Sequence, residues 1–272
     1  MPPPLAAVVL LFLFNKMRIA SWNVNSIKAR LDIVTDWVVG NNCDILLIQE
    51  TKSQDVNFPV SAFKNLGWHA VFHGQKSYNG VAIISRFPIE EVTTGLAGDD
   101  EDEQARYMEA TIRGVRVATI YLPNGNPAPG KKFDYKIAWF KRLEARAREL
   151  LEAEIPIVLG GDFNVIPSDI DCYDPDGWSG DALTHPESIS AFRKLVYVGF
   201  CDALREINPT DVIYTYWDYQ AGAWQRDHGV RIDHFMLSPE AQDKLVNVGV
   251  DKKPRGLEKP SDHTPIWCEL AI

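Results

Sequence analysis

Short, almost wholly apolar runs recur along the chain and constrain its fold more than any other feature. The clearest are DILLIQ (44–49), GVAIIS (80–85) and IPIVLG (155–160), all rich in β-branched residues or leucine. Runs of this length and composition are typical of strands that are buried on both faces. Such strands need cover on both sides, which predicts a layered fold.

Further runs extend this pattern. Strands are predicted over 18–22, 108–112, 115–122, 213–217, 231–237, 245–250 and 264–270. Apolar residues at helical spacing predict helices over about 27–38, 133–153 and 188–196. No stretch has the composition of an interdomain linker. Many strands with few long helices predict an α/β fold, with two sheets packed face to face and helices outside, in one domain spanning 17–272.

The charge balance limits the class of partner. The chain has 272 residues, with 28 basic and 37 acidic side chains, a net charge of −9 and 46% hydrophobic residues. This apolar content excludes a disordered chain. The acidic balance argues against a protein that holds nucleic acid through bulk positive charge, although local basic strips are compatible with it.

The cysteines and the first 16 residues bear on the compartment. None of the four cysteines forms a C-x-x-C pair, which predicts reduced thiols in a cytoplasmic protein without a zinc site. The apolar run Leu5–Phe14 is too short for a membrane span and lacks the basic start of a signal peptide. We expect residues 1–16 to be an apolar leader outside the fold, with Met17 as the natural start. The alternative is a short apolar tail packed on the body.

Polar side chains cluster directly after several of the predicted strands. Glu50 follows one strand, Asn25 follows another, and Asp262 precedes the last. Strand ends are where α/β folds place ligands. Carboxylate and amide oxygens suit Mg²⁺, so Glu50, with Asn25 or Asp262, is a candidate metal site.

A second set of polar residues suits proton transfer. Asp162 and Asn164 follow the run at 155–160, so Asp162 could orient or deprotonate a water while Asn164 donates a hydrogen bond. Asp233 could hold His263 in one tautomer or as a cation aimed at a phosphate. Each residue alone could be a turn, a cap or a satisfied surface group. Together with a metal they make a set suited to phosphodiester hydrolysis.

A series of motifs in fixed order gives this interpretation a family. The segments are SWNVNSIKAR, LLIQETK, HGQKSYNGVAIIS, GDDEDEQAR, YLPNG, GGDFN, YTYWDY, RIDHFML and KPSDHTP. Through them the chain resembles the exonuclease III family of apurinic/apyrimidinic (AP) endonucleases, within the endonuclease/exonuclease/phosphatase superfamily. The resemblance covers about 17–272 and implies a four-layer α-β-β-α sandwich of two mixed sheets, with the active site at one end of both.

The resemblance also assigns site residues, position by position. It implies Glu50 as the main metal ligand, with Asp262 beside it and Asn25 where some members have Asp. The expected metal is Mg²⁺, with Mn²⁺ as a substitute. Asn23 supports the site, and the residues implied in catalysis are Tyr121, Asp162, Asn164, Asp233 and His263.

DNA contacts are expected from basic and aromatic residues. The basic ones are Arg30, Arg106, Lys131, Lys132 and Lys136, while helix residues beyond Lys136 suit a solvated face. By resemblance, Tyr216, Trp217 and Val230 wall a pocket for a sugar without its base, and Trp224 is a candidate contact to the duplex. Core packing is the alternative for these aromatics, above all for Trp217. The acidic run 99–103 is expected in an exposed loop away from DNA.

The expected function is therefore a Mg²⁺-dependent DNA-repair phosphodiesterase. It would incise 5′ to abasic sites, with 3′–5′ exonuclease or 3′-phosphatase side activity. The alternatives are a superfamily relative acting on a non-DNA phosphate ester and a non-enzymatic DNA-binding or scaffold protein. The expected partner is double-stranded DNA with abasic sites or 3′ ends. We expect a monomer with no membrane association, in a cytoplasm of the bacterial type and near the nucleoid through its DNA.

Overall fold

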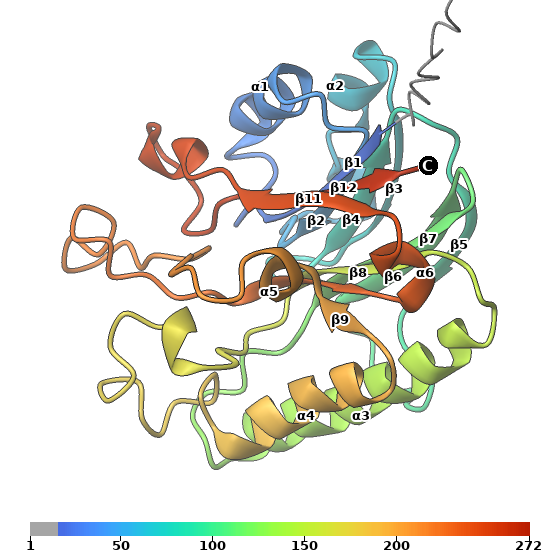
Figure 1. Ribbon diagram of the computed structural model, residues 1–272. Helices are drawn as coiled ribbons and strands as arrows, with labels where there is room; N and C mark the ends of the chain where they lie inside the picture. The colour runs from blue at the N-terminus through green and yellow to red at the C-terminus, as the bar shows by residue number, and fades with distance from the viewer. Residues whose placement is uncertain (1–15) are drawn as a thin grey trace, which may run out of the picture.

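Two six-stranded mixed sheets form the centre of the computed structural model, which describes residues 16–272 (Figure 1). Sheet A has the order β11-β12-β1-β2-β4-β3 and sheet B the order β5-β6-β7-β8-β10-β9. The strands of sheet A are β1 (Lys16–Asn23), β2 (Ile45–Gln49), β3 (His69–His73), β4 (Val81–Ser85), β11 (Leu245–Val250) and β12 (Ile266–Ala271). Those of sheet B are β5 (Glu90–Thr94), β6 (Tyr107–Ile112), β7 (Val115–Tyr121), β8 (Ile157–Asp162), β9 (Cys201–Asp202) and β10 (Asp233–Leu237).

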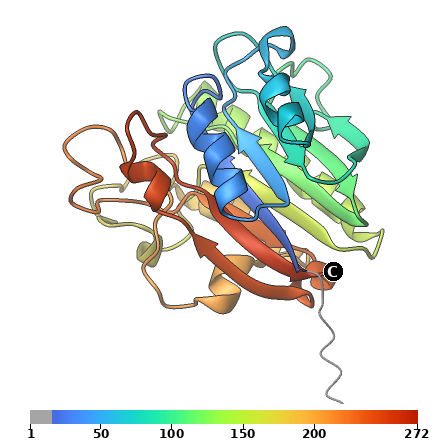
Figure 2. The same ribbon diagram turned by 90° about the horizontal axis from the view of Figure 1, so that it is seen from above.

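Helices cover the outer faces of the two sheets. Figures 1 and 2 show α1 (Leu31–Gly40) and α2 (Val60–Asn65) against sheet A, and Figure 1 shows α3 (Lys131–Leu151) and α4 (Pro186–Tyr197) below sheet B. Two short helices, α5 (Ala203–Ile207) and α6 (Pro239–Gln242), lie near β10. Single 3₁₀ turns occur at Asp55–Asn57, Asp169–Asp171 and Lys253–Gly256. The predicted α-β-β-α sandwich is confirmed.

Strand β2 shows why the apolar runs are apolar throughout. Leu47 packs in the layer between the sheets, whereas Leu46 and Ile48 pack under α1 and α2. Because successive side chains of a strand point to opposite faces, both faces of β2 require apolar residues. In sheet B, Leu159 packs under α3 while Val158 faces the inter-sheet layer.

Some segments differ from the prediction. The long helix begins and ends two residues earlier than expected, and 213–217 forms no strand but isolated bridges through Tyr216. Strand β5 has no buried residue, so it carries no apolar pattern that the sequence could reveal. Of the expectations for residues 1–16, only Lys16 lies within the described residues, where it begins β1. No helix of residues 16–272 is both long and apolar enough to cross a membrane.

Candidate active site

Both sheets deliver polar side chains to one end of the sandwich, on the left in Figure 1. Asn23 ends β1, Tyr121 ends β7 and Asp162 ends β8. Asp162 is opposite Tyr121 in the parallel ladder and opposite Asp233 in the antiparallel one. Residues in register share a face of the sheet, so the side chains of Tyr121, Asp162 and Asp233 point to the same face.

Glu50 and Asn164, like Asn25 with φ 44°, have left-handed backbone conformations just after their strands. Glu50 follows β2 with φ 51°, and Asn164 lies two residues after β8 with φ 48°. Non-glycine residues rarely adopt this conformation, and when they do it often marks a functional site. Here the turn brings both side chains to the end of the sandwich rather than along the sheet.

Hydrogen bonds hold Asp162 from two sides. The Asn23 amide donates to Asp162 Oδ2 at 3.0 Å and to Glu50 Oε1 at 2.9 Å. The main-chain N–H of Asn164 donates to Asp162 Oδ1 at 2.9 Å. Asn23 thus links the two carboxylates, and its support of catalysis stays a prediction.

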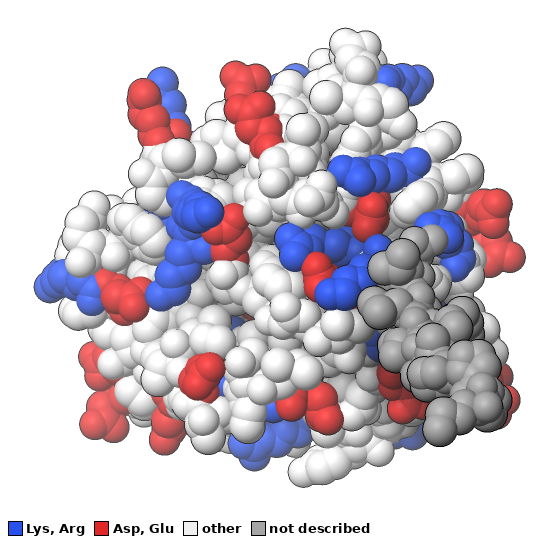
Figure 3. Space-filling model, turned by 45° about the horizontal axis from the view of Figure 1, so that its top comes forward, with Lys and Arg blue, Asp and Glu red and all other residues white. Residues whose placement is uncertain are grey.

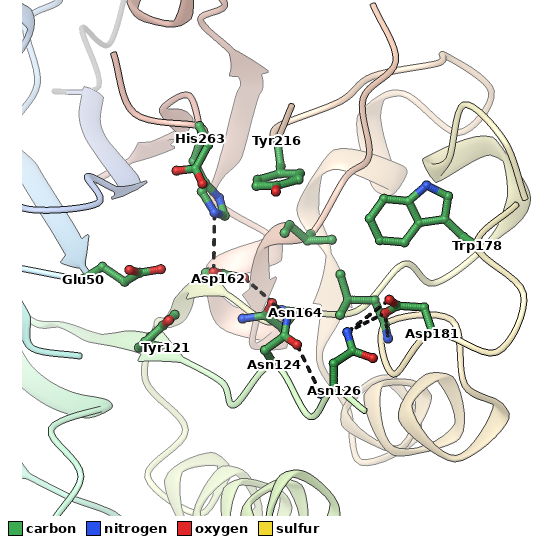
Figure 4. A pocket seen from close by; sticks show the side chains of 13 residues that line it. Glu50, Tyr121, Asn124, Asn126, Asp162, Asn164, Trp178, Asp181, Tyr216 and His263 are labelled. Carbon is green, nitrogen blue, oxygen red and sulfur yellow. Dashed lines mark hydrogen bonds and ion pairs between the residues drawn. The ribbon is translucent and has the colours of Figure 1, made fainter. Parts of the chain in front are cut away.

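His263 and Asp233 form a buried pair beside Asp162. His263 Nδ1 lies 2.9 Å from Asp233 Oδ2, and His263 Nε2 lies 3.7 Å from Asp162 Oδ2 (Figure 4). Burial alone would lower the pKa of His263, but the Asp233 and Asp162 carboxylates outweigh it and raise that pKa. The imidazole is therefore held as a cation at neutral pH.

The two carboxylates that Asn23 joins have opposite pKa shifts. Burial raises the pKa of Asp162 to about 7, and the Asp233 and Glu50 carboxylates add to the increase. Burial opposes ionisation of Glu50 as well, but hydrogen bonds from Asn23 and Lys52 lower its pKa. Near neutral pH, Asp162 can accept a proton while Glu50 stays charged, the separation expected of a base beside a metal ligand.

Glu50 and Asn25 share one positive charge. Lys52 Nζ lies 2.8 Å from Glu50 Oε2 and 2.5 Å from Asn25 Oδ1. The Asn25 amide donates to Asp262 Oδ1 at 3.0 Å, which turns its own oxygen toward Lys52. Oxygen donors that already converge on a cation fit a hard metal ion such as Mg²⁺.

A second group of ligand atoms lies next to these residues. One atom each of Asp162, Asp233 and His263 lie within 4.8 Å of one another, which is close enough for a metal site. The hydrogen bond between Asp233 and His263 occupies two of these atoms. A protonated imidazole has no lone pair for a metal, so this group suits a metal only when His263 is neutral, whereas the oxygens on the Glu50 side suit Mg²⁺ at neutral pH.

The site opens into a pocket of about 310 Å³ (Figure 4). Glu50, Tyr121, Asp162, Asn164, Asp262 and His263 line one side of it. The rest of the lining comes mostly from loops and is mixed, with apolar Trp178, Leu183 and Ile232, the ring of Tyr216, and polar Asn124, Asn126 and Asp181. Tyr216 packs edge-on against His263, with ring centroids 5.0 Å apart.

Tyr121 is an O–H donor with a cation beside it. Burial and the Glu50 carboxylate raise its pKa well above the ordinary value, so the phenol keeps its proton. Arg106 lies over the Tyr121 ring, 4.6 Å from its centroid, and bonds to its carbonyl oxygen at 3.3 Å. The predicted DNA contact Arg106 is thus at the edge of the site.

Several predicted DNA-contacting side chains are not on the surface. Lys136 has no exposed surface, and its ammonium donates to three main-chain carbonyls, so the expectation of a phosphate contact is wrong. Trp217 is also fully buried and donates to Asp227, and neither it nor the buried Val230 lines the pocket. Ile232, two residues after Val230, occupies the wall instead.

The remaining predicted contacts keep some exposure. Lys131 and Lys132 are exposed at the start of α3, and Arg30 is partly exposed while it donates to the carbonyl oxygens of residues 25 and 260. Trp224 is partly exposed and packs edge-on against Trp217. Figure 3 shows basic and acidic side chains interspersed on the face drawn.

Sequence reasoning missed six pocket residues, Asn124, Asn126, Trp178, Asp181, Leu183 and Ile232. Three of them belong to the loop 167–187, whose Asp, Pro and Gly content predicts only a surface loop. The chain motif YLPNG does contain Asn124, so that residue could have been found. The acidic run 99–103 was expected to be an exposed loop, but one of its residues is held by an ion pair. Asp102 Oδ2 lies 2.6 Å from Nη1 of Arg142 on α3.

Known proteins share this architecture. The family model "Endonuclease/Exonuclease/phosphatase family" matches residues 20–263. The chain is 31% identical over 266 residues to exodeoxyribonuclease III of Haemophilus influenzae, and the alignment covers 93% of this chain and 100% of that protein. It is 32% identical over 263 residues to the DNA repair nuclease APEX1 of Danio rerio, covering 94% and 83% respectively.

Solved structures agree with the sequence relatives. An AP endonuclease from Archaeoglobus fulgidus superposes with a TM-score of 0.91 at 38% identity, covering 94% of this chain and 100% of that one. The 3′ phosphatase NExo from Neisseria, bound to a product DNA hairpin, gives a TM-score of 0.92 at 41% identity, covering 93% and 99%. The chain belongs to the endonuclease/exonuclease/phosphatase family and, within it, is a hydrolase of the exonuclease III/AP endonuclease type, a family of DNA-repair nucleases.

Proposed function

We propose that the chain is a Mg²⁺-dependent phosphodiesterase that incises double-stranded DNA 5′ to abasic sites, as a monomer. Exonuclease action from 3′ ends and removal of 3′ phosphates are side activities of the same site. The observation that carries the proposal is the mixed lining of the pocket. In one pocket, a cluster of buried carboxylates and an imidazole meets apolar surface from Leu183, Tyr216 and Ile232.

Water activation is assigned to Asp162. Its raised pKa lets the carboxylate take a proton from water near neutral pH. The two hydrogen bonds from Asn23 and Asn164 hold the carboxylate in one orientation. A fixed base within a buried site saves the reorganisation that a free carboxylate in water would need.

His263 and Tyr121 are assigned to the phosphate. Protonated His263, with Asp233 on its Nδ1, has Nε2 available for a phosphate oxygen. Tyr121 keeps its O–H proton and lines the same pocket. Donors that face the developing charge stabilise the transition state more than the bound substrate.

Glu50, Asp262 and Asn25 are the residues that would hold the metal. The shared contact of Glu50 and Asn25 with the Lys52 ammonium supports a cation position between their oxygens. A bound Mg²⁺ would supply positive charge to the phosphate and its leaving oxygen.

The apolar wall supports selection of a sugar without a base. The ring of Tyr216 and the side chain of Ile232 give a flipped deoxyribose apolar surface to pack against. Lys131, Lys132, Arg30 and Arg106 are proposed to contact phosphates, and Trp224 the duplex. Because charges of both signs alternate on the surface drawn in Figure 3, shape rather than bulk attraction is expected to dominate.

A comparison of substrates in separate reactions tests the proposal. The protein is incubated with a labelled duplex that contains one abasic site, with a nicked duplex that ends in a 3′ phosphate, and with small phosphate esters, each with Mg²⁺ or EDTA. Incision 5′ to the abasic site that needs Mg²⁺ and exceeds phosphate removal is the expected result. Faster removal of the 3′ phosphate would make that the main activity. Turnover of small phosphate esters alone would support the non-DNA alternative, and binding without turnover would support the scaffold alternative.

A further inference from the structure

Among the lysines of residues 16–272, Lys136 alone has a completely buried side chain. It comes from the inner face of α3, and its Nζ donates to the carbonyl oxygens of Asn164 at 2.6 Å, Asn124 at 3.0 Å and Ala182 at 3.2 Å. A lysine with no carboxylate within ion-pair distance is unusual inside a protein, because burial of a charge costs free energy unless the surroundings compensate.

The three carbonyls belong to three separate segments around the pocket. Asn124 lies in the loop after β7, Asn164 in the loop after β8, and Ala182 in the loop 167–187. Each segment also contributes side chains to the pocket wall, including Asn124, Asn164 and Leu183. One ammonium group therefore joins the main chains of the loops that shape the site.

A short chain of hydrogen bonds connects Lys136 to the proposed base. Its shortest hydrogen bond is to the carbonyl oxygen of Asn164, and the N–H of the same residue donates to Asp162 Oδ1. The Asn124 side chain donates to Asn164 Oδ1 at 3.1 Å, so a second segment held by Lys136 also contacts Asn164. Movement of residue 164 would release one of the two groups that orient Asp162.

The local sequence is arranged to admit the lysine. Gly125 passes so close that a Cβ there would lie 2.6 Å from Lys136 Cδ, and its φ of +91° suits glycine. Three carbonyl acceptors match the three protons of an ammonium group, whereas a neutral amine has two. Burial lowers the pKa of Lys136 to about 7, and the carboxylates of Asp162 and Asp181 oppose that decrease.

We propose that Lys136 is a positioning residue for catalysis: its buried ammonium locks the loops after β7 and β8 and the loop 167–187 into the geometry that orients Asp162. The proposal rests on the assignment of Asp162 as the water-activating group. It replaces the direct DNA contact expected from the sequence. A positioning role predicts loss of the chemical step without loss of DNA affinity.

The test compares Lys136→Met with Arg146→Met on the same helix. Methionine keeps the length of the stem but has no protons to donate. Arg146 bonds to the buried Glu109 of β6 and lines no part of the pocket, so it is a control for loss of a buried ion pair on α3. For each folded variant, single-turnover incision of an abasic duplex with Mg²⁺ and affinity for the same duplex in EDTA are measured, together with the melting temperature.

We expect Lys136→Met to lose about 10²-fold in incision rate, the size of effect that a small misplacement of a catalytic group produces. Its DNA affinity should stay within about 3-fold of wild type, because the ammonium is inaccessible. Arg146→Met should lower the melting temperature and leave the rate unchanged. If Lys136→Met does not fold, Lys136→Gln is measured instead, with a smaller rate loss expected and the same unchanged affinity.

Two results would overturn the proposal. One is a wild-type incision rate in a folded Lys136 variant, and the other is a DNA affinity weakened as much as the incision rate. Asp162→Asn, measured in parallel, keeps the two hypotheses apart. An active Asp162→Asn protein would refute the assignment of Asp162 as the base. An inactive Asp162→Asn protein together with a fully active Lys136→Met protein would refute only the positioning role of Lys136.

Discussion

Replacement of Asp171 by alanine should destabilise the protein in a pH-dependent way. Asp171 is fully buried and accepts hydrogen bonds from Arg231 Nε at 2.6 Å and Nη2 at 3.1 Å, and from Arg205. Arg231 also contacts Asp202 at 2.8 Å. This network ties the loop 167–187 to the residue just before Ile232 and β10.

The magnitude follows from burial and from the pKa of Asp171. Burial would raise that pKa, but the hydrogen bonds and charge of Arg231, with Arg205, lower it from 3.8 to about 2. A shift of this size is worth about 2 kcal/mol of stability. Removal of one partner also leaves the guanidinium of Arg231 with less compensation inside the protein, so we expect a loss of about 3 kcal/mol at pH 7.

The assay is urea unfolding of wild type and Asp171→Ala at pH 7, 5, 4 and 3. Because the folded-state pKa is lowered, the stabilisation is complete above the unfolded pKa of 3.8 and is lost as pH falls toward about 2. The difference between the two proteins should therefore be constant from pH 7 to 5 and shrink below pH 4.

Asp169→Ala is the matched control, since Asp169 is exposed in the same 3₁₀ turn. It should change stability by less than about 0.5 kcal/mol. Equal losses in the two variants, or a difference for Asp171→Ala that does not change down to pH 3, would refute the reasoning.

Three further predictions concern the pocket. His263→Gln should lower the single-turnover incision rate by about 10²-fold or more at nearly unchanged DNA affinity, and a loss confined to affinity would contradict its assignment. Tyr216→Ala should reduce the preference for abasic over intact duplex, measured as the ratio of kcat/KM values; an unchanged ratio would remove it from the selecting wall. Mg²⁺ should raise the melting temperature of the wild type, as ligand binding to the folded state requires. Glu50→Gln should abolish most of that increase, and a full increase in the variant would place the metal elsewhere.

The fold was predictable from the sequence because the apolar runs carry their burial in their composition. Residues 45–48 of β2 alternate between two buried layers, so this stretch has no polar position and its composition alone predicts a buried strand. By contrast, β5 is exposed along its whole length and left no periodic pattern. Residues 213–217 have the β-branched and aromatic composition of a strand, yet they form only isolated bridges because Tyr216 pairs with Val230 and His263 at the pocket rather than with a sheet neighbour.

The site was predictable to the extent that its residues lie at strand ends within recognisable motifs. Glu50, Asp162 and His263 were found in this way, and the structure brings them together in one pocket. Trp178 and Leu183 come from a loop whose composition indicates only a turn-rich surface, so their approach to the pocket depends on tertiary contacts. The prediction that Lys136 contacts DNA failed for a related reason. A lysine near the start of a basic helix is expected to be exposed, and only the tertiary structure places three carbonyl oxygens around its ammonium group.

Asp162→Asn offers the most direct test of the central claim, that this buried carboxylate activates water for DNA phosphodiester cleavage. The variant is compared with wild type in single-turnover incision of an abasic duplex with Mg²⁺, and in binding to the same duplex. We expect the variant to lose almost all incision activity and to bind the duplex with an affinity close to that of wild type. Incision at the wild-type rate by a folded Asp162→Asn protein would contradict this claim.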